Sequence, residues 1–488
     1  MTAIAKPTRA QMNVGGRWVD AESGASFESV SPATGEVLGV LPDAGREDAR
    51  RAIGAAGAVS AAVAALPMLE RIRLCHAVGD RLDSRREEVA RLLSLEQGKP
   101  LVEAASEVAF AADLFRNAGE DVRRLDTAII PSSDPAKRIL TIRQPHGVVA
   151  VITPWNYPVG IPSQYLSACL AVGNAVVWKP APTTSLIAVK LLECMLDAGV
   201  PEGAVSLVFG GPEVGDEIVS NPGTQAVGFT GSPGVGQAIA RSAGAKPMLL
   251  ELGGNGPTII LDDADLELAV AGTAFGCFSN AGQICQSSER ILVHPKVHDA
   301  VLEGLVEQAR AIRLGHPLEP ETTMGPLNNE AVANKVDEHL ADAVARGATI
   351  VAGGGRTNDF PTRLYYPPNV VDAVPLDSLL ATDETFGPVA PVLAVRDADE
   401  VIRIANESPY GLCCSVYTGS LSRAFRYAER LQCGVVNVNE SAAYWDGRTP
   451  FGGYSGKSSG VGRLGGEAVI TTMTQLKSIV LHVGNGGA

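Results

Sequence analysis

Short apolar runs alternate with helical stretches between residues 148 and 243, and this alternation restricts the fold more than any other feature of the chain. Strands and helices that alternate with short loops build a parallel sheet with helices on both faces. The sequence therefore predicts an α/β fold with a doubly wound parallel sheet. The expected strands are 148–153, 175–178, 205–209 and 226–230, and the expected helices lie near 160–172, 185–199, 212–220 and 234–243.

The segments on either side of this region have other patterns. Residues 46–125 are rich in Ala and Arg with apolar positions at helical spacing, so we expect helices there. Residues 138–143 alternate like a strand with one exposed face, and residues 469–483 have the composition of an extended segment. A second α/β pattern begins after Gly253. Because 488 residues are too many for one core, we expect two or three domains.

The charge balance is acidic, with 54 Asp and Glu against 40 Lys and Arg and a formal net charge of −14. Such a charge repels nucleic acids and anionic membranes, and the sequence contains no basic cluster to oppose it. No segment has the apolar length of a signal peptide or of a membrane span. The cysteines lack paired spacing, and no zinc pattern is present. We expect a cytoplasmic protein with no metal, nucleic-acid partner or membrane.

Cys285 is the best candidate nucleophile among the eight cysteines. It follows a small-residue turn and precedes a polar segment, whereas cysteines such as Cys75 and Cys169 lie in apolar surroundings. A thiol is a useful nucleophile where local dipoles stabilise its thiolate and a substrate can reach it. Taken alone, Cys285 could equally be a small buried residue. Other segments of the chain favour the nucleophile.

Polar residues in four further segments complete an ordered set with Cys285. Asn156 lies in Thr-Pro-Trp-Asn-Tyr-Pro, Lys179 in Val-Trp-Lys-Pro and Glu251 in Leu-Leu-Glu-Leu-Gly-Gly-Asn. Glu384 and Phe386 lie in Asp-Glu-Thr-Phe-Gly-Pro. In their order and spacing, these five blocks closely resemble the aldehyde dehydrogenase superfamily.

The resemblance implies three structural parts and an oligomer. Residues 1–122 and 147–252 would form a dinucleotide-binding domain, and residues 253–465 an α/β catalytic domain. Residues 123–146 and 466–488 would form a small β arm, in which the tail pairs with the strand at 137–146. Such an arm implies a homodimer or a homotetramer.

The resemblance also implies oxidation of an aldehyde to a carboxylic acid. Cys285 would add to the aldehyde, because its carbon can release a hydride only after a nucleophile has added. The side-chain amide of Asn156 and the backbone N–H of Cys285 would stabilise the oxyanion. Glu251 would be the general base that hydrolyses the thioester, and its apolar neighbours predict a raised pKa. Its presence favours hydrolysis over transfer to coenzyme A.

The expected cofactor is NAD. The turn after the strand at 226–230 opens a helix and suits a pyrophosphate, although its glycine spacing is atypical and a plain tight turn is the alternative. By resemblance, Lys179 and Glu384 would hold the two riboses and Ser232 the pyrophosphate. NADP stays open, because Pro182 stands where many NAD-preferring relatives have a glutamate. The full set of expected contacts is Thr153, Pro154, Trp155, Lys179, Gly231, Ser232, Leu252, Glu384 and Phe386.

The expected substrate is an aromatic or bulky apolar aldehyde. The pattern around Cys285 looks like those of benzaldehyde and vanillin dehydrogenases, and aromatic residues recur in the predicted pocket. Arg448 supports an alternative, a semialdehyde whose carboxylate the arginine would bind, although a solvated loop arginine is equally compatible with its position. The pocket residues expected by resemblance are Tyr157, Ile161, Gln164, Tyr165, Ile284, Gln286, Tyr444, Trp445 and Arg448.

Three other functions were weighed. A cysteine acyltransferase or thioester hydrolase needs an activating histidine, and the nearest in sequence, His294 and His298, lie in no evident site. A structural protein with a dead site is disfavoured because Asn156, Glu251 and Cys285 are all present. The segment 452–458 imitates a phosphate-binding loop, but Phe451 stands where that motif needs glycine. The loop around Lys457 is longer than the family pattern, which leaves the alignment of Lys457 open.

Overall fold

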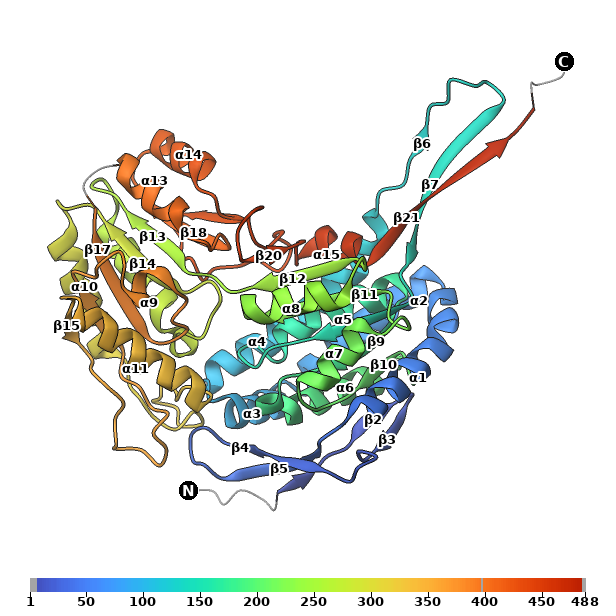
Figure 1. Ribbon diagram of the computed structural model, residues 1–488, viewed down its shortest axis with the longest axis horizontal. Helices are drawn as coiled ribbons and strands as arrows, with labels where there is room; N and C mark the ends of the chain where they lie inside the picture. Colours follow the sequence, from blue (N-terminus) through green and yellow to red (C-terminus); the bar gives the residue numbers. More distant parts are fainter. Residues whose placement is uncertain (1–6, 396–397, 485–488) are drawn as a thin grey trace.

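An eight-stranded sheet forms the centre of the larger part of the molecule (Figure 1). The computed structural model describes residues 7–395 and 398–484. The five central strands of this sheet are parallel, and the added strands at its ends are antiparallel to their neighbours. Its strand order is β20 (Gly460–Val461), β12 (Met248–Leu252), β11 (Ala226–Gly231), β8 (Val148–Ile152), β9 (Ala175–Lys179), β10 (Val205–Leu207), β2 (Met12–Val14) and β3 (Arg17–Val19).

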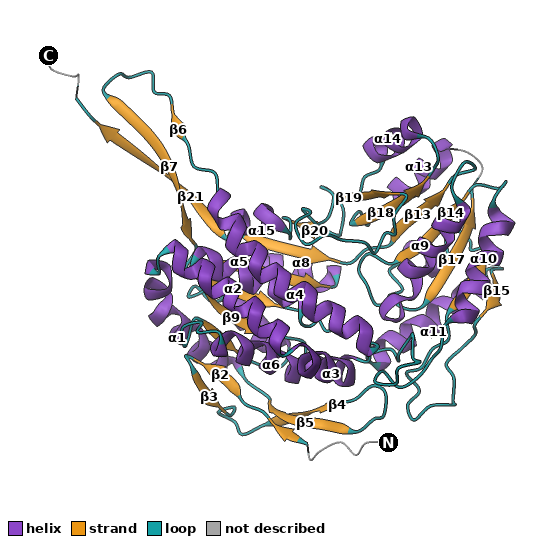
Figure 2. Cartoon of the chain, turned by 180° about the vertical axis from the view of Figure 1, so that it is seen from behind, coloured by secondary structure: helices purple, strands orange, loops and turns teal. Residues whose placement is uncertain are grey.

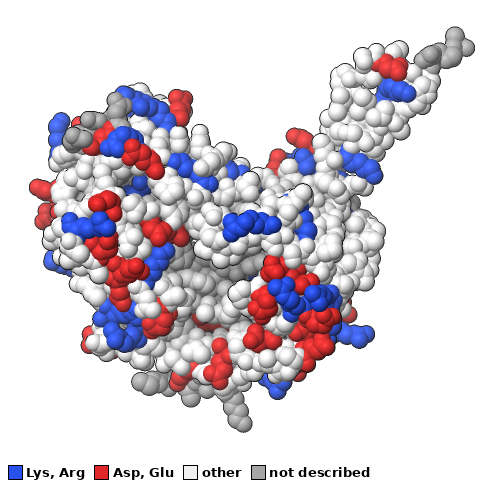
Figure 3. Space-filling model, in the orientation of Figure 1, with Lys and Arg blue, Asp and Glu red and all other residues white. Residues whose placement is uncertain are grey.

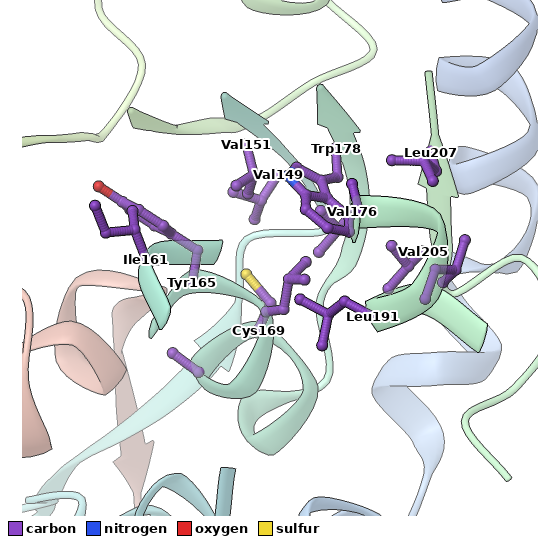
Figure 4. Close-up of a cluster of buried hydrophobic side chains, with 14 of the residues drawn as sticks. Val149, Val151, Ile161, Tyr165, Cys169, Val176, Trp178, Leu191, Val205 and Leu207 are labelled. Atoms are coloured by element: carbon purple, nitrogen blue, oxygen red, sulfur yellow. The ribbon is translucent and has the colours of Figure 1, made fainter. Parts of the chain in front are cut away.

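Helices cover both faces of this first sheet. On the face seen in Figure 2, α5 (Gly160–Val172) and α6 (Ser185–Asp197) pack on the strands, with α2 (Met68–Ser84), α3 (Arg86–Gln97) and α4 (Leu101–Asp121) outside them. Helices α1 (Arg46–Ala65), α7 (Pro212–Ser220) and α8 (Pro233–Ala243) pack together on the other face. Short 3-10 turns lie at Val122–Arg124 and Pro182–Thr184. In Figure 4, Cys169 of α5 and Leu191 of α6 pack against Val149, Val176 and Trp178 of the sheet.

A seven-stranded sheet organises the second part of the molecule. Its strands are parallel except for β15 at one edge. The strand order is β15 (Thr349–Ala352), β16 (Asn369–Asp372), β17 (Val389–Ala394), β14 (Ser288–Val293), β13 (Gly256–Ile260), β18 (Cys413–Tyr417) and β19 (Val435–Val438). The helices of this part are α9 (Leu266–Phe278), α10 (His298–Ala311), α11 (Glu330–Ala345), α12 (Leu379–Thr382), α13 (Ala398–Glu407) and α14 (Leu421–Arg430).

Two smaller sheets complete the fold. At the N-terminal side, β1 (Thr8–Arg9), β5 (Val37–Pro42) and β4 (Ser26–Val30) form one of them. The other consists of β21 (Thr474–His482), β7 (Lys137–Pro145) and β6 (Ile129–Ile130), and it projects from the rest of the molecule as an arm (Figure 1). Strand β21 follows α15 (Gly466–Thr472) and pairs with β7 in antiparallel register over its whole length.

The predicted α/β fold is confirmed, and the expected strands and helices of residues 148–243 occur in the expected order. The predicted helices of residues 46–125 and the pairing of the tail with β7 are also present. The prediction for residues 469–472 was wrong, because they end helix α15 and only residues 474–482 are extended. Buried Val469 and Ile470 pack this helix into the first core, which overrides the β propensity of the threonines.

Two separate hydrophobic cores accompany the two large sheets. The first core contains buried residues from Ala10 to Leu252 together with a group from Leu412 to Met473, and the second extends from Ile259 to Leu431. Strand β20 lies in the first sheet, although the boundary expected at residue 465 groups it with the second. Within the described residues, no single helix is long and apolar enough to cross a membrane, and the bent pair α1 and α2 meets that requirement only jointly.

Candidate active site

Cys285 follows an unusual turn between α9 and β14. Asn280, Ala281 and Gly282 all have left-handed backbone conformations, with φ angles of 50°, 54° and 73°. Two of these residues are not glycine, so the turn stores strain of the kind that collects at functional sites. The turn leaves Cys285 partly exposed, whereas Cys75, Cys169, Cys194 and Cys277 are buried.

Close backbone contacts bring Cys285 next to the segments of Glu251 and Glu384. A Cβ atom added to Gly254 would lie 2.2 Å from the carbonyl oxygen of Cys285, and one added to Gly253 would lie 2.7 Å from the Glu384 carboxylate. No side chain fits at such distances. The Gly-Gly pair after β12 therefore allows the chain to pass from the first sheet to the second directly against the nucleophile.

The Asn156 side chain is fixed beside the same turn. It is 3% exposed, and its Nδ2 donates a hydrogen bond to the Gln283 carbonyl at 3.0 Å. An amide nitrogen carries two protons, so one donor stays available for a substrate oxygen. The backbone carbonyl of Asn156 accepts bonds from Lys99 Nζ at 2.8 Å and from Asn280 Nδ2 at 3.1 Å.

Glu251 lies at the end of β12 and is 2% exposed. Burial raises its pKa to about 8, and the neighbouring Glu384 carboxylate adds to the rise, while the Cys285 thiol and the Thr230 hydroxyl oppose it. Burial and the nearby Glu251 and Glu384 carboxylates also raise the pKa of the Cys285 thiol. The raised pKa of Glu251 brings this carboxyl into the range that suits acid–base work near neutral pH.

Two cavities meet at Cys285. The first has a volume of about 300 Å³ and lies at the carboxyl ends of the first sheet. The second has a volume of about 330 Å³ and is bounded by α4, α5 and the loop before Phe451. Cys285, Glu251 and Ile161 line both cavities, and Asn156 lines the first. A molecule in either cavity therefore reaches the same sulfur atom.

The first cavity has features that fit a dinucleotide. Gly231 and Ser232 line it just before α8, whose free N–H groups face anions favourably. Trp155 and Phe386 form an edge contact at 5.5 Å between ring centroids, and Phe386 has a strained φ of 60°. Glu384 accepts a bond from Gly254 N at 2.9 Å, and burial raises its pKa to about 7.

Two of the expected cofactor contacts, Lys179 and Thr153, lie outside the lining of the first cavity. The others belong to it, including Pro154 and Leu252. Lys179 ends β9 and is 7% exposed, and its carbonyl accepts the Thr153 N–H at 3.1 Å. Burial lowers its pKa to about 8, against the nearby carboxylates of Glu213 and Asp43, and no hydrogen bond from its Nζ occurs within the described residues. A buried ammonium group in this position has N–H donors that suit a ribose hydroxyl. Thr153 instead accepts a bond from Trp178 Nε1 at 2.9 Å.

Several lining residues of the first cavity had no signal in the sequence. They come from the start of α11 and its preceding loop, which lie nearly 50 residues after Cys285 in the chain. Lys335 is the most informative of them, because its charge lowers the pKa of the Glu384 carboxyl. The helical pattern of this segment gives no indication of the cavity that it faces. The residues are Asn329, Ala331, Val332 and Lys335.

The second cavity has an aromatic wall. Tyr157, Ile161, Ile284, Gln286 and Trp445 line it, as the sequence led us to expect. Trp445 contacts Phe110 and Phe451, with ring centroids 5.6 and 4.9 Å apart. The sequence reasoning missed the contribution of other segments, whose contacts depend on the tertiary fold. The missed residues are Val102, Glu103, Ser106, Glu107 and Phe110 of α4, Gly160 of α5, Phe275 of α9, and Ser279, Ala443, Phe451 and Leu464.

Four expected pocket residues do not line the second cavity. Tyr165 faces the sheet, where its hydroxyl bonds Phe229 O at 2.9 Å and Thr230 Oγ1 at 2.8 Å. Gln164 is 2% exposed on the fully buried helix α5. Arg448 is exposed and bonds Asn117 Oδ1 at 2.9 Å, and Tyr444 is 52% exposed. None of the four is in the lining of the second cavity, although Tyr165 lies close to Glu251 and Cys285. Burial raises the pKa of the Tyr165 hydroxyl, and the charges of these two groups add to the rise.

The histidines weighed for a non-redox hydrolase lie elsewhere. His298 contacts Asp299 and Asp372, and His294 accepts a bond from its own loop. Neither lines a cavity that contains Cys285. Lys457 also has a structural contact, because its Nζ donates to the carbonyls of Asn406 and Ser408.

Sequence comparisons agree with this geometry. The profile of the aldehyde dehydrogenase family matches residues 18–479. A glutarate-semialdehyde dehydrogenase of Pseudomonas aeruginosa is 39% identical over 98% of both chains. The NADP(+) succinate-semialdehyde dehydrogenase of Escherichia coli K12 is 37% identical over 96% of this chain and 97% of its own.

Solved structures give the same result. A succinate-semialdehyde dehydrogenase from Burkholderia pseudomallei has a TM-score of 0.95 and 37% identity over 97% of this chain and 98% of its own. The betaine aldehyde dehydrogenase of Staphylococcus aureus, solved with NAD+, has a TM-score of 0.94 and 32% identity over 98% of this chain and 96% of its own. The chain belongs to the aldehyde dehydrogenase family, and it is an NAD(P)-dependent oxidoreductase that oxidises an aldehyde.

Proposed function

We propose that the protein oxidises an aromatic or bulky apolar aldehyde to its carboxylic acid, with Cys285 as nucleophile, Asn156 as oxyanion donor and Glu251 as general base. The observation that carries the proposal is the meeting of two cavities at Cys285, with Glu251 in the wall of both. A cofactor in the first cavity and an aldehyde in the second would therefore both reach the sulfur atom of Cys285.

The reaction begins with loss of the thiol proton, for which the adjacent Glu251 is the acceptor. The sulfur then adds to the aldehyde carbon, and the oxygen of the thiohemiacetal takes the negative charge. The free N–H of the Asn156 amide and the backbone N–H of Cys285 stabilise that charge. A nicotinamide dinucleotide held in the first cavity by residues such as Ser232 and Glu384 would supply the acceptor for the hydride that leaves the carbon. Once Glu251 has released the first proton to solvent, its carboxylate removes a proton from water, whose oxygen attacks the thioester and releases the acid and the Cys285 thiolate.

For the cofactor we propose NAD, with NADP also accepted. Pro182 supplies no carboxylate to repel a 2′-phosphate, and Lys179 would be a donor there beside the carboxylates of Glu213 and Asp43. The relatives divide in the same way, because the Escherichia coli enzyme carries NADP(+) in its name and the Staphylococcus aureus structure contains NAD+. Ser232 and the start of α8 would hold the pyrophosphate.

The charge of the second cavity supports an uncharged aldehyde. Its described lining contains no lysine or arginine, and its ionisable acids are Glu103, Glu107 and Glu251. Lys99 already pairs with Glu107, and burial raises the pKa of Glu103 to about 7 and that of Glu251 to about 8. A semialdehyde would bring a further carboxylate into this wall without a cation to meet it, at a cost in desolvation. Arg448, the cation expected to hold such a group, lies outside the cavity. The aromatic wall of Phe110, Tyr157, Phe275, Trp445 and Phe451 favours a flat apolar substrate instead.

A semialdehyde substrate is the second candidate. The relatives named above favour it, since two of them act by name on glutarate or succinate semialdehyde. The two candidates differ in one measurable quantity, the preference for a neutral over an anionic aldehyde.

We also propose that the arm joins copies of the chain into a homodimer or homotetramer. Strand β21 is the edge of the arm sheet and has exposed apolar residues, including Leu476 at 57% and Val480 at 61%. The face of the arm seen in Figure 3 is mostly uncharged. An unpaired apolar edge in water is normally covered, and a second copy would cover it.

The proposed function is tested by cofactor reduction. With NAD or NADP and a panel of benzaldehyde, succinic semialdehyde, betaine aldehyde and short aliphatic aldehydes, we expect reduced-nicotinamide absorbance for at least one aldehyde. Cys285→Ala should lower kcat at least about a thousandfold, because no other group forms the thiohemiacetal. Cys75→Ala, a buried cysteine far along the chain in α2, should retain activity. Ester or thioester hydrolysis without any cofactor reduction would contradict the proposal.

The pH dependence of thioester hydrolysis reports on Glu251. The carboxylate is the active form of the base, and its pKa is raised to about 8. The hydrolysis rate of a preformed acyl-enzyme, followed by mass spectrometry, should therefore rise as pH increases through about 8 and level off above it. Glu251→Gln should accumulate the acyl-enzyme at all pH values. A rate that is flat from pH 6 to 9, or rapid hydrolysis by the variant, is incompatible with this role.

Substrate selection is tested with a charged and an uncharged aldehyde. We expect kcat/KM for benzaldehyde to exceed that for succinic semialdehyde at least about tenfold. Trp445→Ala should lower kcat/KM for benzaldehyde about tenfold to a hundredfold, because the ring loses aromatic contact. Tyr444→Ala, the exposed neighbour on the same loop, should have little effect. A preference for succinic semialdehyde would favour the second candidate.

The role of the arm is tested by light scattering after size-exclusion chromatography. The wild-type protein should have the mass of a dimer or tetramer, and Leu476→Lys with Val480→Lys should shift it to the monomer. Leu421→Lys, 76% exposed on α14, is the matched control and should leave the mass unchanged. A monomeric wild-type protein would exclude this role of the arm.

A further inference from the structure

A buried ion pair lies directly behind the turn that carries Asn156. Lys99 lies just before α4, and its Nζ is 2.6 Å from Oε2 of Glu107, which lies on α4. The two side chains are 1% and 0% exposed. Lys99 lines neither of the cavities that meet at Cys285. The proposed reaction steps do not use this pair.

Both members of the pair bond to the backbone of the turn. Lys99 Nζ donates to the Asn156 carbonyl at 2.8 Å and lies 3.9 Å from the centroid of the Tyr157 ring. Glu107 Oε1 accepts the N–H groups of Val159 at 2.8 Å and of Gly160 at 2.9 Å. The segment from Asn156 to the start of α5 is therefore held at both ends by one ion pair.

Stability alone does not account for this arrangement. Removing a lysine and a glutamate from water costs several kcal/mol per ion, and apolar residues of similar volume often stabilise a core equally well. What an apolar pair cannot do is bond a backbone carbonyl and two backbone N–H groups in fixed directions. The pair therefore supplies geometry at Asn156 that packing would leave loose.

We propose that Lys99 is a positioning residue, which together with Glu107 fixes the Asn156 amide where the oxyanion develops. The inference rests on the proposed role of Asn156. The Asn156 side chain is anchored at Nδ2 by Gln283 O, and the bond from Lys99 fixes the backbone of the same residue. Because the side-chain amide and the backbone carbonyl of Asn156 are both held, the second N–H of the amide points in one fixed direction. An oxyanion donor acts only within a narrow range of position, and a displacement near 1 Å costs about a hundredfold in rate.

Two reactions of Cys285 separate positioning of the oxyanion donor from general damage, and neither needs a cofactor. Attack on p-nitrophenyl acetate forms a tetrahedral oxyanion before p-nitrophenolate leaves. Alkylation by iodoacetamide forms a sulfur–carbon bond while iodide leaves, and no oxyanion develops. A group that acts through the oxyanion affects the first rate and not the second.

Lys99→Met keeps the length of the side chain and removes the charge and the donor. We expect the ester reaction to slow about tenfold to a hundredfold, with the alkylation rate within about twofold of wild type. Lys296→Met, at an exposed lysine, is the matched control and should change neither rate. Glu107→Gln retains an oxygen facing Val159 and Gly160 and should show the same selective loss, so the comparison survives if Lys99→Met does not fold.

A double-mutant cycle with Asn156→Ala decides the route of the effect. If Lys99 acts through Asn156, Lys99→Met causes less than about a twofold further loss of the ester reaction once the amide is absent. If the rate losses of Lys99→Met and Asn156→Ala multiply in the double mutant, the inference is overturned. An equal fall of the ester and alkylation rates in Lys99→Met would also overturn it. An unchanged ester reaction in Asn156→Ala would overturn both the inference and the proposed oxyanion donor, whereas loss in Asn156→Ala with full activity in Lys99→Met would overturn the inference alone.

Discussion

The contact between Gly254 and the carbonyl of Cys285 is the constraint on which the site depends. The chain leaves the first sheet after Glu251 and enters the second at Gly256, and it passes the nucleophile within a distance that excludes any side chain. A similar contact holds Gly282 against the carbonyl of Gly387, where an added Cβ would lie 2.0 Å away. Glycines therefore bring the segments of Glu251, Cys285 and Glu384 together, and a methyl group at either position would separate them.

The segments that meet here also bury acidic side chains, and this burial costs free energy. Glu251, Glu289 and Glu384 are all nearly inaccessible to water, and burial raises the pKa of each carboxyl. Glu289 accepts the N–H groups of Thr385 and Phe386 at 2.7 Å each, which holds the strained Phe386 turn against the first cavity. Such groups destabilise a fold unless they are bonded, and two of them, Glu251 and Glu384, add to the effect of burial in raising the pKa of the Cys285 thiol, so the buried acids act directly on the proposed nucleophile.

The sequence predicts most of the fold and the centre of the site, and it fails where contacts depend on tertiary packing. The strands of residues 148–230 were predictable because each is a short apolar run between helices. Cys285, Asn156 and Glu251 were found from their motifs, and the structure places all three on one cavity. The lining of the second cavity was predicted only in part. Helix α5 is buried on all sides, so its sequence pattern does not indicate which face meets the cavity. Tyr165 was therefore assigned to the pocket although it faces the sheet.

Membership of a family and choice of substrate depend on different parts of this molecule. Most of the motif residues, namely Asn156, Glu251, Cys285, Glu384 and Phe386, line the first cavity, where the chemistry is the same for every aldehyde. The second cavity shares Glu251 and Cys285 with it, but much of its remaining wall comes from α4, Phe275 of α9 and the loop before Phe451, which lie outside the motifs. Two relatives that are 39% and 37% identical to this chain share its type of reaction. Their names specify glutarate and succinate semialdehyde, which are anionic substrates. The acidic residues of the second cavity, Glu103, Glu107 and Glu251, therefore carry more information about the aldehyde than the family motifs do, and this is why the proposed substrate rests on that cavity.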